Sequence, residues 1–553
     1  MGMGRGFRFH MKTKRFLLAF AVLLSTSLPL LAFSSCGDKG VISTSTTPAP
    51  TPNLYLPFVV KNCQDLLPTP TPTNTPVPTG TPTPTPTGSP PSFGVQTLGE
   101  ITNATARQRI VDAGIRWVRI SISWASIEGL QGTYNWAATD AALGSAVNAG
   151  LVPLAEVRTG PQWAVENMPI DQSTGKHYDC GPIDAEDLNA WSVFIQALVE
   201  RYDGDGVNDA PGSPVVQYWE IWNEPDNQLL DASCVFVGGC WGGNLDGDST
   251  PDYQEYAELL RRAYLAAKAA NPAAQVVFGS IAYEKISQNC FNLDFANNVL
   301  SYLRSNYGSD ANFPFFDLMG FHFYGNPSLA GDWNPADIIG KAKGSGVNNM
   351  AGKPSIKGLL ANYSINKPLI CTEYGRASSG GDTRDPPETQ QGQSRYVVRG
   401  TTQAMTMWPN EMVAAIWYTL VDAAGQKPFG LLESGTLNAK SSWYAYQTTT
   451  SELVGGSYAR PLADTGIEGY VFTMPSGREK TVLWATGNPV NRDFAVLSSQ
   501  WLRVVRMYDA GDDNWRWIVD MIQDGGTGDL DGMVNGNVRI QIEAAPKFVE
   551  QTP

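Results

Sequence analysis

The sequence predicts an α/β fold in which a (β/α)8 barrel, also called a TIM barrel, precedes a small antiparallel β-sandwich. From Phe93 onward, runs rich in β-branched and aromatic residues alternate with helical patterns, which is typical of a parallel sheet built from βα units. Eight such units can be counted before about Ser451. Beyond that point the helical pattern stops, and short β-rich runs separated by Asn and Gly residues take over.

Residues 1–35 have the pattern of a secretory signal peptide, because basic residues precede an apolar run from Phe16 to Leu31. Polar residues and Pro29 interrupt this run, which argues against a membrane span. The segment ends in Phe33-Ser34-Ser35-Cys36, which loosely resembles the lipobox of bacterial lipoproteins and implies lipidation of Cys36. Ordinary cleavage near Ala32 is the alternative. Either way we expect export, to the cell surface or to the medium.

Residues 36–92 read as a linker, since two stretches of them are largely Thr and Pro. Such a composition favours extended polyproline II conformation and does not build a core. A short apolar insert from Leu54 to Val60 interrupts the linker and has no explanation from the sequence. We therefore expect a spacer between the N-terminus and the barrel, which we assign to residues 93–451.

The barrel elements follow in order. The expected strands cover residues 94–98, 116–123, 151–157, 215–223, 274–279, 316–322, 368–373 and 412–418. The expected helices cover residues 102–113, 137–149, 185–202, 253–270, 294–305, 356–363, 389–407 and 441–452. Gly114 and Gly150 directly follow the first two helices, where glycine commonly ends a helix.

The sandwich is expected over residues 452–553, with short strands near residues 470–472, 481–484, 502–508, 515–522 and 538–542. Its Trp residues at positions 484, 515 and 517 could bind sugar or form a core. The sequence favours a domain that stabilises the barrel over a sugar-binding module.

Charge and cysteine content narrow the class of protein. A net charge of −14 and a pI near 4.8 argue against nucleic-acid binding, because the basic residues form no patch outside the extreme N-terminus. The seven Cys residues are too scattered for a disulfide scaffold and show no metal-binding Cys pairs. One or two disulfides are compatible with an exported protein, and Cys234 with Cys240 is a candidate pair.

A carboxylic acid ends the fourth expected strand. The apolar run from Val215 finishes in Asn223-Glu224-Pro225, and Pro225 cannot donate to a sheet ladder. Proline also disfavours helical geometry in the preceding residue, so Glu224 is expected in extended conformation. The carboxyl ends of barrel strands are where barrel enzymes place their chemistry.

This motif resembles glycoside hydrolase clan A, whose fourth barrel strand ends in Asn-Glu-Pro with the Glu as general acid/base. The seventh expected strand ends in Thr372-Glu373-Tyr374, and Glu373 is similar to the seventh-strand nucleophile of that clan. Glycosidic hydrolysis usually needs two carboxyl groups that flank the scissile bond. The resemblance, which extends from about Phe93 to the C-terminus, therefore implies Glu224 and Glu373 as catalytic residues of a retaining glycosidase.

Four further residues are implied as substrate-binding or supporting. Arg119 is a charged residue within an apolar strand, so it should be buried against an acid, plausibly Glu373, whose ionised form it would stabilise. By the resemblance, Asn223 would bond the sugar 2-hydroxyl. His322 and Tyr324 match the His-x-Tyr often found on the sixth strand of the clan, although His322 could also be a core residue.

Aromatic side chains near strand ends could stack on sugar rings. Trp417 on the eighth strand is the best candidate, because clan enzymes frequently place a Trp there. Trp124 and Trp163 are equally compatible with substrate contact and with packing.

No metal site is expected at the catalytic centre, since a chain with three His, one of them at position 10, cannot assemble a three-histidine site after signal cleavage. Two acidic loops, 203–209 and 246–252, space their oxygens as calcium loops do. They depart from the EF-hand pattern at Val207 and Thr250, so two Asp-Gly turns are the alternative to structural calcium.

Together these observations predict an exported, monomeric retaining glycoside hydrolase that needs no cofactor and acts on a plant- or microbial-type polysaccharide or oligosaccharide. A surface carbohydrate-binding protein on a barrel scaffold is the alternative. The sequence leaves the sugar, the linkage and the mode of cleavage open.

Overall fold

The structure, a computed structural model, describes residues 93–228, 238–283, 290–324, 336–344, 353–379, 389–508 and 516–553. These residues belong to one compact unit, Thr83–Pro553. The expected signal peptide, Cys36 and most of the Thr/Pro linker fall outside that unit, and all residues before Phe93 lie outside the described part of the chain.

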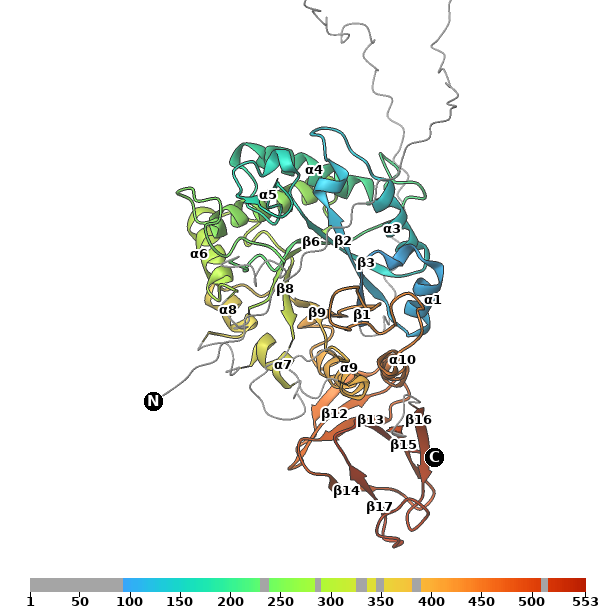
Figure 1. The fold of residues 1–553 in the computed structure, drawn as a ribbon. Coiled ribbons are helices and arrows are strands. Elements are labelled where there is room, and N and C mark those ends of the chain that lie inside the picture. Colours follow the sequence, from blue (N-terminus) through green and yellow to red (C-terminus); the bar gives the residue numbers. More distant parts are fainter. Residues whose placement is uncertain are drawn as a thin grey trace, which may run out of the picture. The chain divides into compact units, whose positions relative to one another are not determined.

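Eight parallel strands close into a barrel, as the sequence predicts (Figure 1). Each strand pairs with its neighbour along the chain, and the last strand pairs with the first. The strands are β1 (Phe93–Thr97), β2 (Trp117–Ser123), β3 (Val152–Arg158), β6 (Tyr218–Asn223), β7 (Gln275–Ile281), β8 (Leu318–Phe323), β9 (Leu369–Tyr374) and β10 (Met412–Trp417). A two-stranded hairpin, β4 (Ile170–Asp171) with β5 (Lys176–His177), projects from the connection after β3.

Helices follow every barrel strand. The main ones are α1 (Ala104–Asp112), α3 (Ala137–Asn148), α4 (Leu188–Arg201), α5 (Asp252–Ala270), α6 (Phe295–Tyr307), α8 (Ile356–Asn362), α9 (Gln390–Met405) and α10 (Ser441–Leu453). Shorter helices are α2 (Trp124–Ile127), α7 (Ala336–Lys343) and three 3₁₀ turns, at Glu100–Thr102, Gln162–Ala164 and Ala185–Asp187. None of the helices in the described ranges is long and apolar enough to cross a membrane.

Local sequence explains where several helices begin and end. The side chain of Asn103 accepts hydrogen bonds from the backbone at the start of α1, and Ser355 and Thr389 cap α8 and α9 in the same way. Gly114 and Gly150 adopt φ of +70° and +71° just after α1 and α3, which confirms the helix ends expected there.

The core has two layers. One cluster fills the floor of the barrel and contains inward-facing residues such as Trp117, Leu154, Leu318 and Ile416. A larger cluster lies between the strands and the surrounding helices. Because side chains alternate along a strand, each barrel strand contributes to both layers, and its inward side chains near the carboxyl end are left to form a site.

The C-terminal strands form a six-stranded antiparallel sheet and a two-stranded one. The larger sheet has the order β11 (Ser457–Pro461), β12 (Ile467–Thr473), β13 (Glu479–Ala485), β18 (Lys547–Thr552), β15 (Trp501–Tyr508) and β16 (Arg516–Ile522). The smaller one pairs β14 (Val490–Ala495) with β17 (Asn537–Ile542). The sequence missed β11, β14 and β18. Most residues of β11 and β14 are exposed or half-buried, so these two strands lack a clear apolar pattern.

The sandwich packs on α9 and α10, which lie between it and the barrel in Figure 1. Phe472, Trp484 and Phe548 of the sandwich belong to the same hydrophobic cluster as the barrel helices. Trp484 is 1% exposed, which makes it a core residue. Trp517 is partly buried against Phe548, and Trp515 lies outside the described residues.

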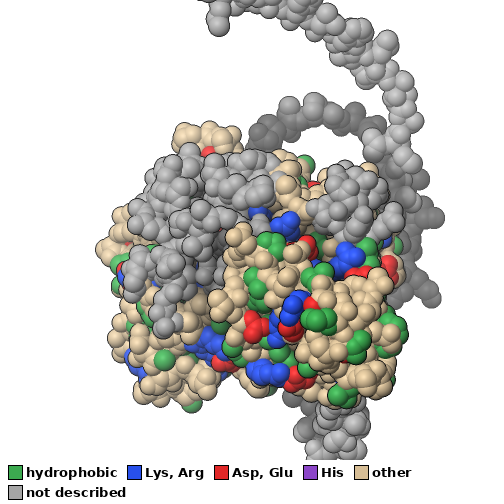
Figure 2. Space-filling model, turned by 90° about the horizontal axis from the view of Figure 1, so that it is seen from below, with side chains coloured by type: hydrophobic (Ala, Val, Ile, Leu, Met, Phe, Trp, Pro, Cys, Tyr) green, Lys and Arg blue, Asp and Glu red, His purple; other side chains and the backbone are tan. Residues whose placement is uncertain are grey.

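Acidic and basic side chains are interspersed on the face that Figure 2 shows. Ion pairs also join sandwich strands, such as Arg539 with Asp493 at 2.6 Å and Arg506 with Asp520 at 2.5 Å. Such exposed pairs contribute little to stability, on the order of 0–1 kcal/mol each.

Candidate active site

The two predicted catalytic carboxylates lie at the carboxyl ends of β6 and β9. Glu224 follows the last residue of β6, and Glu373 is the penultimate residue of β9. Their residues are 7% and 6% exposed. Glu224 has a φ of +42°, in the left-handed region, so the expectation of extended geometry before Pro225 is wrong. Such unusual backbone angles are concentrated at functional sites.

The side chains of Glu224 and Glu373 converge beside His322. One oxygen of Glu224, one of Glu373 and a ring nitrogen of His322 all lie within 4.8 Å of one another. An oxygen–oxygen distance below this limit is compatible with the roughly 5–5.5 Å between the carboxyl groups of retaining glycosidases, and it is shorter than the roughly 6.5–9.5 Å of inverting ones.

Arg119 is fully buried at the centre of this site and donates to four side chains. Its Nη1 lies 2.6 Å from Glu373 Oε1, which is the ion pair that the sequence predicts. Its Nε lies 2.6 Å from Glu220 Oε2, and Nη1 also reaches Gln96 at 2.8 Å. Glu220 is not among the residues predicted from the sequence. Like Arg119, it is a charged residue within an apolar strand, and this pattern could have identified it.

Asn223 accepts a hydrogen bond from Arg119 Nη2 at Oδ1, at 2.7 Å. Since a guanidinium only donates, this contact fixes which end of the amide carries the NH₂ group. The amide nitrogen therefore faces Gly238, where a Cβ would lie 2.7 Å from it and 2.8 Å from Glu224 Cβ. Gly238 has a φ of +105°, so glycine permits both the turn and the close approach.

His322 contacts the Glu224 carboxylate directly, with 2.8 Å between Nδ1 and Oε1. Its Nε2 lies 3.1 Å from Thr372 Oγ1, which in turn bonds Ser280 and Glu220. Burial, Arg119 and Lys341 all lower the pKa of His322 well below its usual value. The imidazole is therefore neutral, and it orients Glu224 as a hydrogen-bond partner.

Glu373 is held by two donors. Arg119 approaches Oε1, and the Tyr324 hydroxyl donates to Oε2 at 2.5 Å. Burial raises the pKa of Glu373 above its ordinary value, and the Arg119 charge and the Tyr324 hydrogen bond act in the opposite direction. The expected ionising effect of Arg119 is present, but burial outweighs it.

Trp417 does not face the site, so the prediction that it forms a sugar-binding subsite is wrong. Its ring is fully buried and packs edge-on against Tyr374 and Tyr396, on the helix side of β10. The neighbouring Tyr418 is on the other side of the chain, half-buried, and its pKa is raised by burial and by the charges of Glu373 and Glu224. Tyr418 therefore lies near the carboxylates, as Tyr324 does.

Trp124 is also a core residue rather than a substrate contact. It is fully buried, stacks on Phe194 and donates to Glu128 at 2.7 Å. Trp163 packs edge-on against Trp124 and remains half-buried, so part of its ring is accessible.

Residues 238–241, in the connection between β6 and α5, form a wall beside Glu224. Gly239 N donates to Asn223 O at 2.7 Å, and Trp241 N donates to Pro225 O at 3.0 Å. Cys240 forms a disulfide with Cys180 from the loop after β3, so the expected pairing with Cys234 is wrong. Cys290 is disulfide-bonded as well. A cysteine pairing depends on which loops meet in space, which residue spacing does not reveal.

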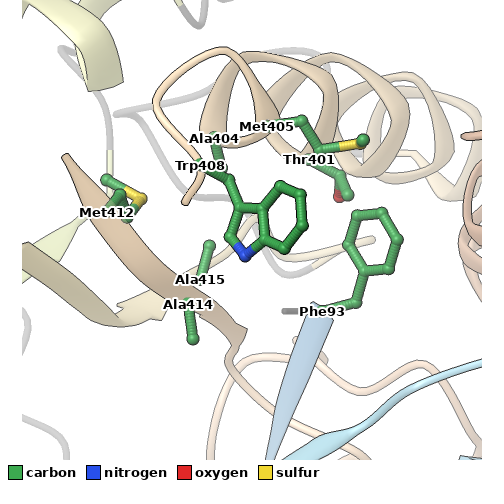
Figure 3. A pocket seen from close by; sticks show the side chains of 8 residues that line it. All are labelled: Phe93, Thr401, Ala404, Met405, Trp408, Met412, Ala414 and Ala415. Carbon is green, nitrogen blue, oxygen red and sulfur yellow. The ribbon is translucent and has the colours of Figure 1, made fainter. Parts of the chain in front are cut away.

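A cavity of about 10 Å³ lies at the opposite end of the barrel (Figure 3). Its lining comes from β1, α9 and β10 and includes Phe93, Met405, Trp408 and Met412. That volume is about the space for one water molecule. The cavity is a packing defect at the amino ends of the strands and not a substrate site.

Three groups of acidic or His side chains within the described ranges have the spacing of metal ligands. One is Glu224, His322 and Glu373, but His322 already uses both ring nitrogens in hydrogen bonds. The other two are the acidic loops singled out in the sequence, Asp203 with Asp205 and Asp209, and Asp246 with Asp248 and Glu255.

No known family's sequence model matches this chain, and no curated protein is similar enough in sequence to be matched. Solved structures do resemble it. A family 39 glycoside hydrolase from Bacteroides cellulosilyticus WH2 superposes with a TM-score of 0.54 at 15% identity, covering 84% of this chain and 81% of that one. A glucosidase from Croceicoccus marinus gives 0.53 at 16% identity, with 84% and 98% covered. A monomeric β-xylosidase from Caulobacter crescentus CB15 gives 0.52 at 16% identity, with 84% and 96% covered. The chain shares the barrel-and-sandwich fold of these proteins.

Proposed function

We propose that this protein is a retaining glycoside hydrolase of the clan A type, with Glu373 as nucleophile and Glu224 as general acid/base. The observation that supports it most is the 4.8 Å limit on the distance between the two carboxylate oxygens. Inverting enzymes need a wider spacing between the carboxyl groups, which leaves room for the attacking water. Structural neighbours that are described as glycosidases agree with this assignment.

The reaction would proceed in two displacements. First, a Glu373 oxygen bonds to the anomeric carbon while the bond to the leaving oxygen breaks, and Glu224 gives its proton to that oxygen. Second, Glu224 takes a proton from water, and the water oxygen displaces Glu373 from the anomeric carbon. The two inversions restore the starting configuration.

The surrounding side chains suit these roles. Arg119 and Tyr324 each donate to one Glu373 oxygen, so the nucleophile is positioned before substrate arrives. Asn223 can donate its amide hydrogens toward a sugar hydroxyl beside Glu224. His322 is neutral and hydrogen-bonds to Glu224, so it positions Glu224 without itself acting as the proton donor.

The substrate is proposed to be a plant- or microbial-type polysaccharide or oligosaccharide, bound by a monomer that needs no cofactor for the chemistry. The N-terminal pattern supports export, with the 36–92 linker as a spacer and Cys36 as a possible lipid attachment point. Fractionation would test this, and Cys36→Ser should release the protein from membranes if the lipid is the anchor.

The decisive experiment compares two variants on aryl glycosides. Glu373→Ala should abolish turnover of every substrate. Glu224→Ala should keep the first step for dinitrophenyl glycosides, whose leaving group needs no proton, and azide should rescue it as a glycosyl azide of retained configuration. Glu479→Ala on the half-exposed surface of the sandwich is the matched control and should behave as wild type.

A product of inverted configuration would contradict the mechanism. The alternative function, a carbohydrate-binding protein without activity, predicts no turnover on any glycoside together with measurable binding of oligosaccharides. In that case Glu224→Ala and Glu373→Ala would change affinity only.

A further inference from the structure

The acidic loop between β6 and α5 brings three carboxylates together outside the catalytic centre. One oxygen from each of Asp246, Asp248 and Glu255 lies within 4.8 Å of the others. Oxygens that bind the same Ca²⁺ at roughly 2.3–2.6 Å can be at most about 5 Å apart, so the spacing fits a shared ion.

A buried carboxylate in the same loop lacks part of its hydrogen bonding. Asp252, the first residue of α5, is 0% exposed. Its Oδ2 accepts from Leu245 N at 3.0 Å, but no donor among the described residues reaches the buried Oδ1. Glu255 Oε2 is likewise buried, and no donor from the described ranges reaches it. Leaving a buried carboxylate oxygen unsatisfied is unfavourable, and a cation would satisfy it.

The charges in this loop point the same way. Four carboxylates lie close enough to Glu255 to interact with it electrostatically: Asp246, Asp252, Asp248 and Asp184. A group of like charges that is partly buried and close together is stable when a multivalent cation neutralises it.

We propose that this loop binds one Ca²⁺ through Asp246, Asp248 and Glu255, with Asp252 as a further ligand. The donors are all carboxylate oxygens on a loop and a helix start, which suits the flexible, oxygen-rich coordination of Ca²⁺. Mg²⁺ demands a stricter octahedron at shorter distances, and Zn²⁺ prefers nitrogen and sulfur ligands.

The ion would restrict the movement of the loop whose residues 238–241 lie beside Glu224. Residues 238–241 of this loop contact the backbone of Asn223 and Pro225, and Asp246 to Glu255 anchor its other end to α5. Its effect on the protein would therefore be to hold this wall in place. The proposal stands whether or not the catalytic assignment is right.

The second acidic loop provides an internal control. Asp203, Asp205 and Asp209 also have oxygens within 4.8 Å of one another. They lie between α4 and β6, at the amino end of that strand, and none of the three residues is fully buried. Asp209 Oδ1 is also buried without a donor among the described residues, but this loop has no fully buried carboxylate comparable to Asp252, so we assign no ion to it.

Calorimetric titration of the chelator-treated full-length protein with CaCl₂ tests the proposal directly. Wild type and Asp205→Asn should bind Ca²⁺ at one site, with Mg²⁺ at least ~10-fold weaker. Asp252→Asn and Glu255→Gln should weaken Ca²⁺ binding at least ~10-fold. Saturating Ca²⁺ should also raise the Tm of wild type by at least ~3 °C, which needs no variant.

Absence of both heat and Tm change in wild type at 5 mM CaCl₂ would overturn the proposal. So would binding that is lost in Asp205→Asn and kept in Asp252→Asn and Glu255→Gln. Neither measurement uses glycoside turnover, so failure here is separate from failure of the proposed catalytic function.

Discussion

At the scale of single residues, Arg119 links side chains on β6 to Glu373 on β9. It pairs with Glu220 and Glu373 and lies 3.8 Å from Glu156, all in a buried environment. Removing one partner from such a buried group typically costs on the order of 3–5 kcal/mol, because a charge is left uncompensated. The arrangement fixes Glu373 and Asn223 relative to one another, which a single point charge such as Lys would not do.

The hydroxyl of Tyr324 gives a prediction at the same scale. Its hydrogen bond lowers the pKa of Glu373, so Tyr324→Phe should raise that pKa further. The nucleophile must be ionised, so the acidic limb of the pH profile of kcat/KM should shift to higher pH. A charge-assisted hydrogen bond is worth about 1.5–3 kcal/mol, which corresponds to a shift of up to about 1–2 pH units.

Tyr418→Phe is the matched control for this measurement. Its hydroxyl donates to Gln426 at 2.8 Å instead of to a carboxylate. An equal shift of the acidic limb in both variants would show that the direct bond from Tyr324 is not the cause.

At the scale of elements, the alternation of side chains along β10 decides what reaches the site. Ile416 belongs to the barrel floor, so Trp417 faces the helices and Tyr418 faces inward again. Moving by one residue along a strand reverses the side on which a side chain lies. The most conspicuous aromatic residue of the strand is therefore a packing residue, and its neighbour is the candidate substrate contact.

Two adjacent substitutions separate these roles. Trp417→Ala should lower the free energy of unfolding by about 3–5 kcal/mol, because it leaves a cavity against Tyr374 and Tyr396. Tyr418→Ala should change stability by less than about 1 kcal/mol and raise KM for aryl glycosides instead. Denaturant unfolding and steady-state kinetics on both variants check this, and the reverse pattern would mean that the strand faces were assigned wrongly.

At the scale of the whole molecule, the sandwich and the barrel share a core. Lys480 and Arg503 of the sandwich bind Glu452 at the end of α10, with distances of 2.7 Å and 2.8 Å. Gln403 of α9 donates to Glu468 of β12 at 2.6 Å. Together with the shared hydrophobic cluster, these contacts favour a stabilising role for the sandwich over a separate sugar-binding module.

Two truncations test this organisation. Deleting residues 36–92 should leave Tm and turnover unchanged, because a Thr/Pro linker contributes no core. Ending the chain at residue 456 should give an aggregating protein, since it exposes the apolar faces of α9 and α10. A soluble barrel with a wild-type thermal transition would show instead that the sandwich is an independent module.

The sequence by itself determined the barrel, the positions of its strands and the two carboxylates at strand ends. These features are local: side-chain periodicity marks each element, glycine ends a helix, and proline ends a strand directly after Glu224. It also identified Arg119 as buried, because an isolated charge within an apolar strand needs an acidic partner.

Only the tertiary structure decided which groups meet. The pairing of Arg119 with Glu220, the hydrogen bond between His322 and Glu224 and the disulfide between Cys180 and Cys240 join residues that are 60 to 101 positions apart. The inward position of Tyr418 depends on the register at which the barrel closes. The physical reason is that these contacts depend on strand register and loop path, which are set by packing of the whole barrel and not by any local pattern.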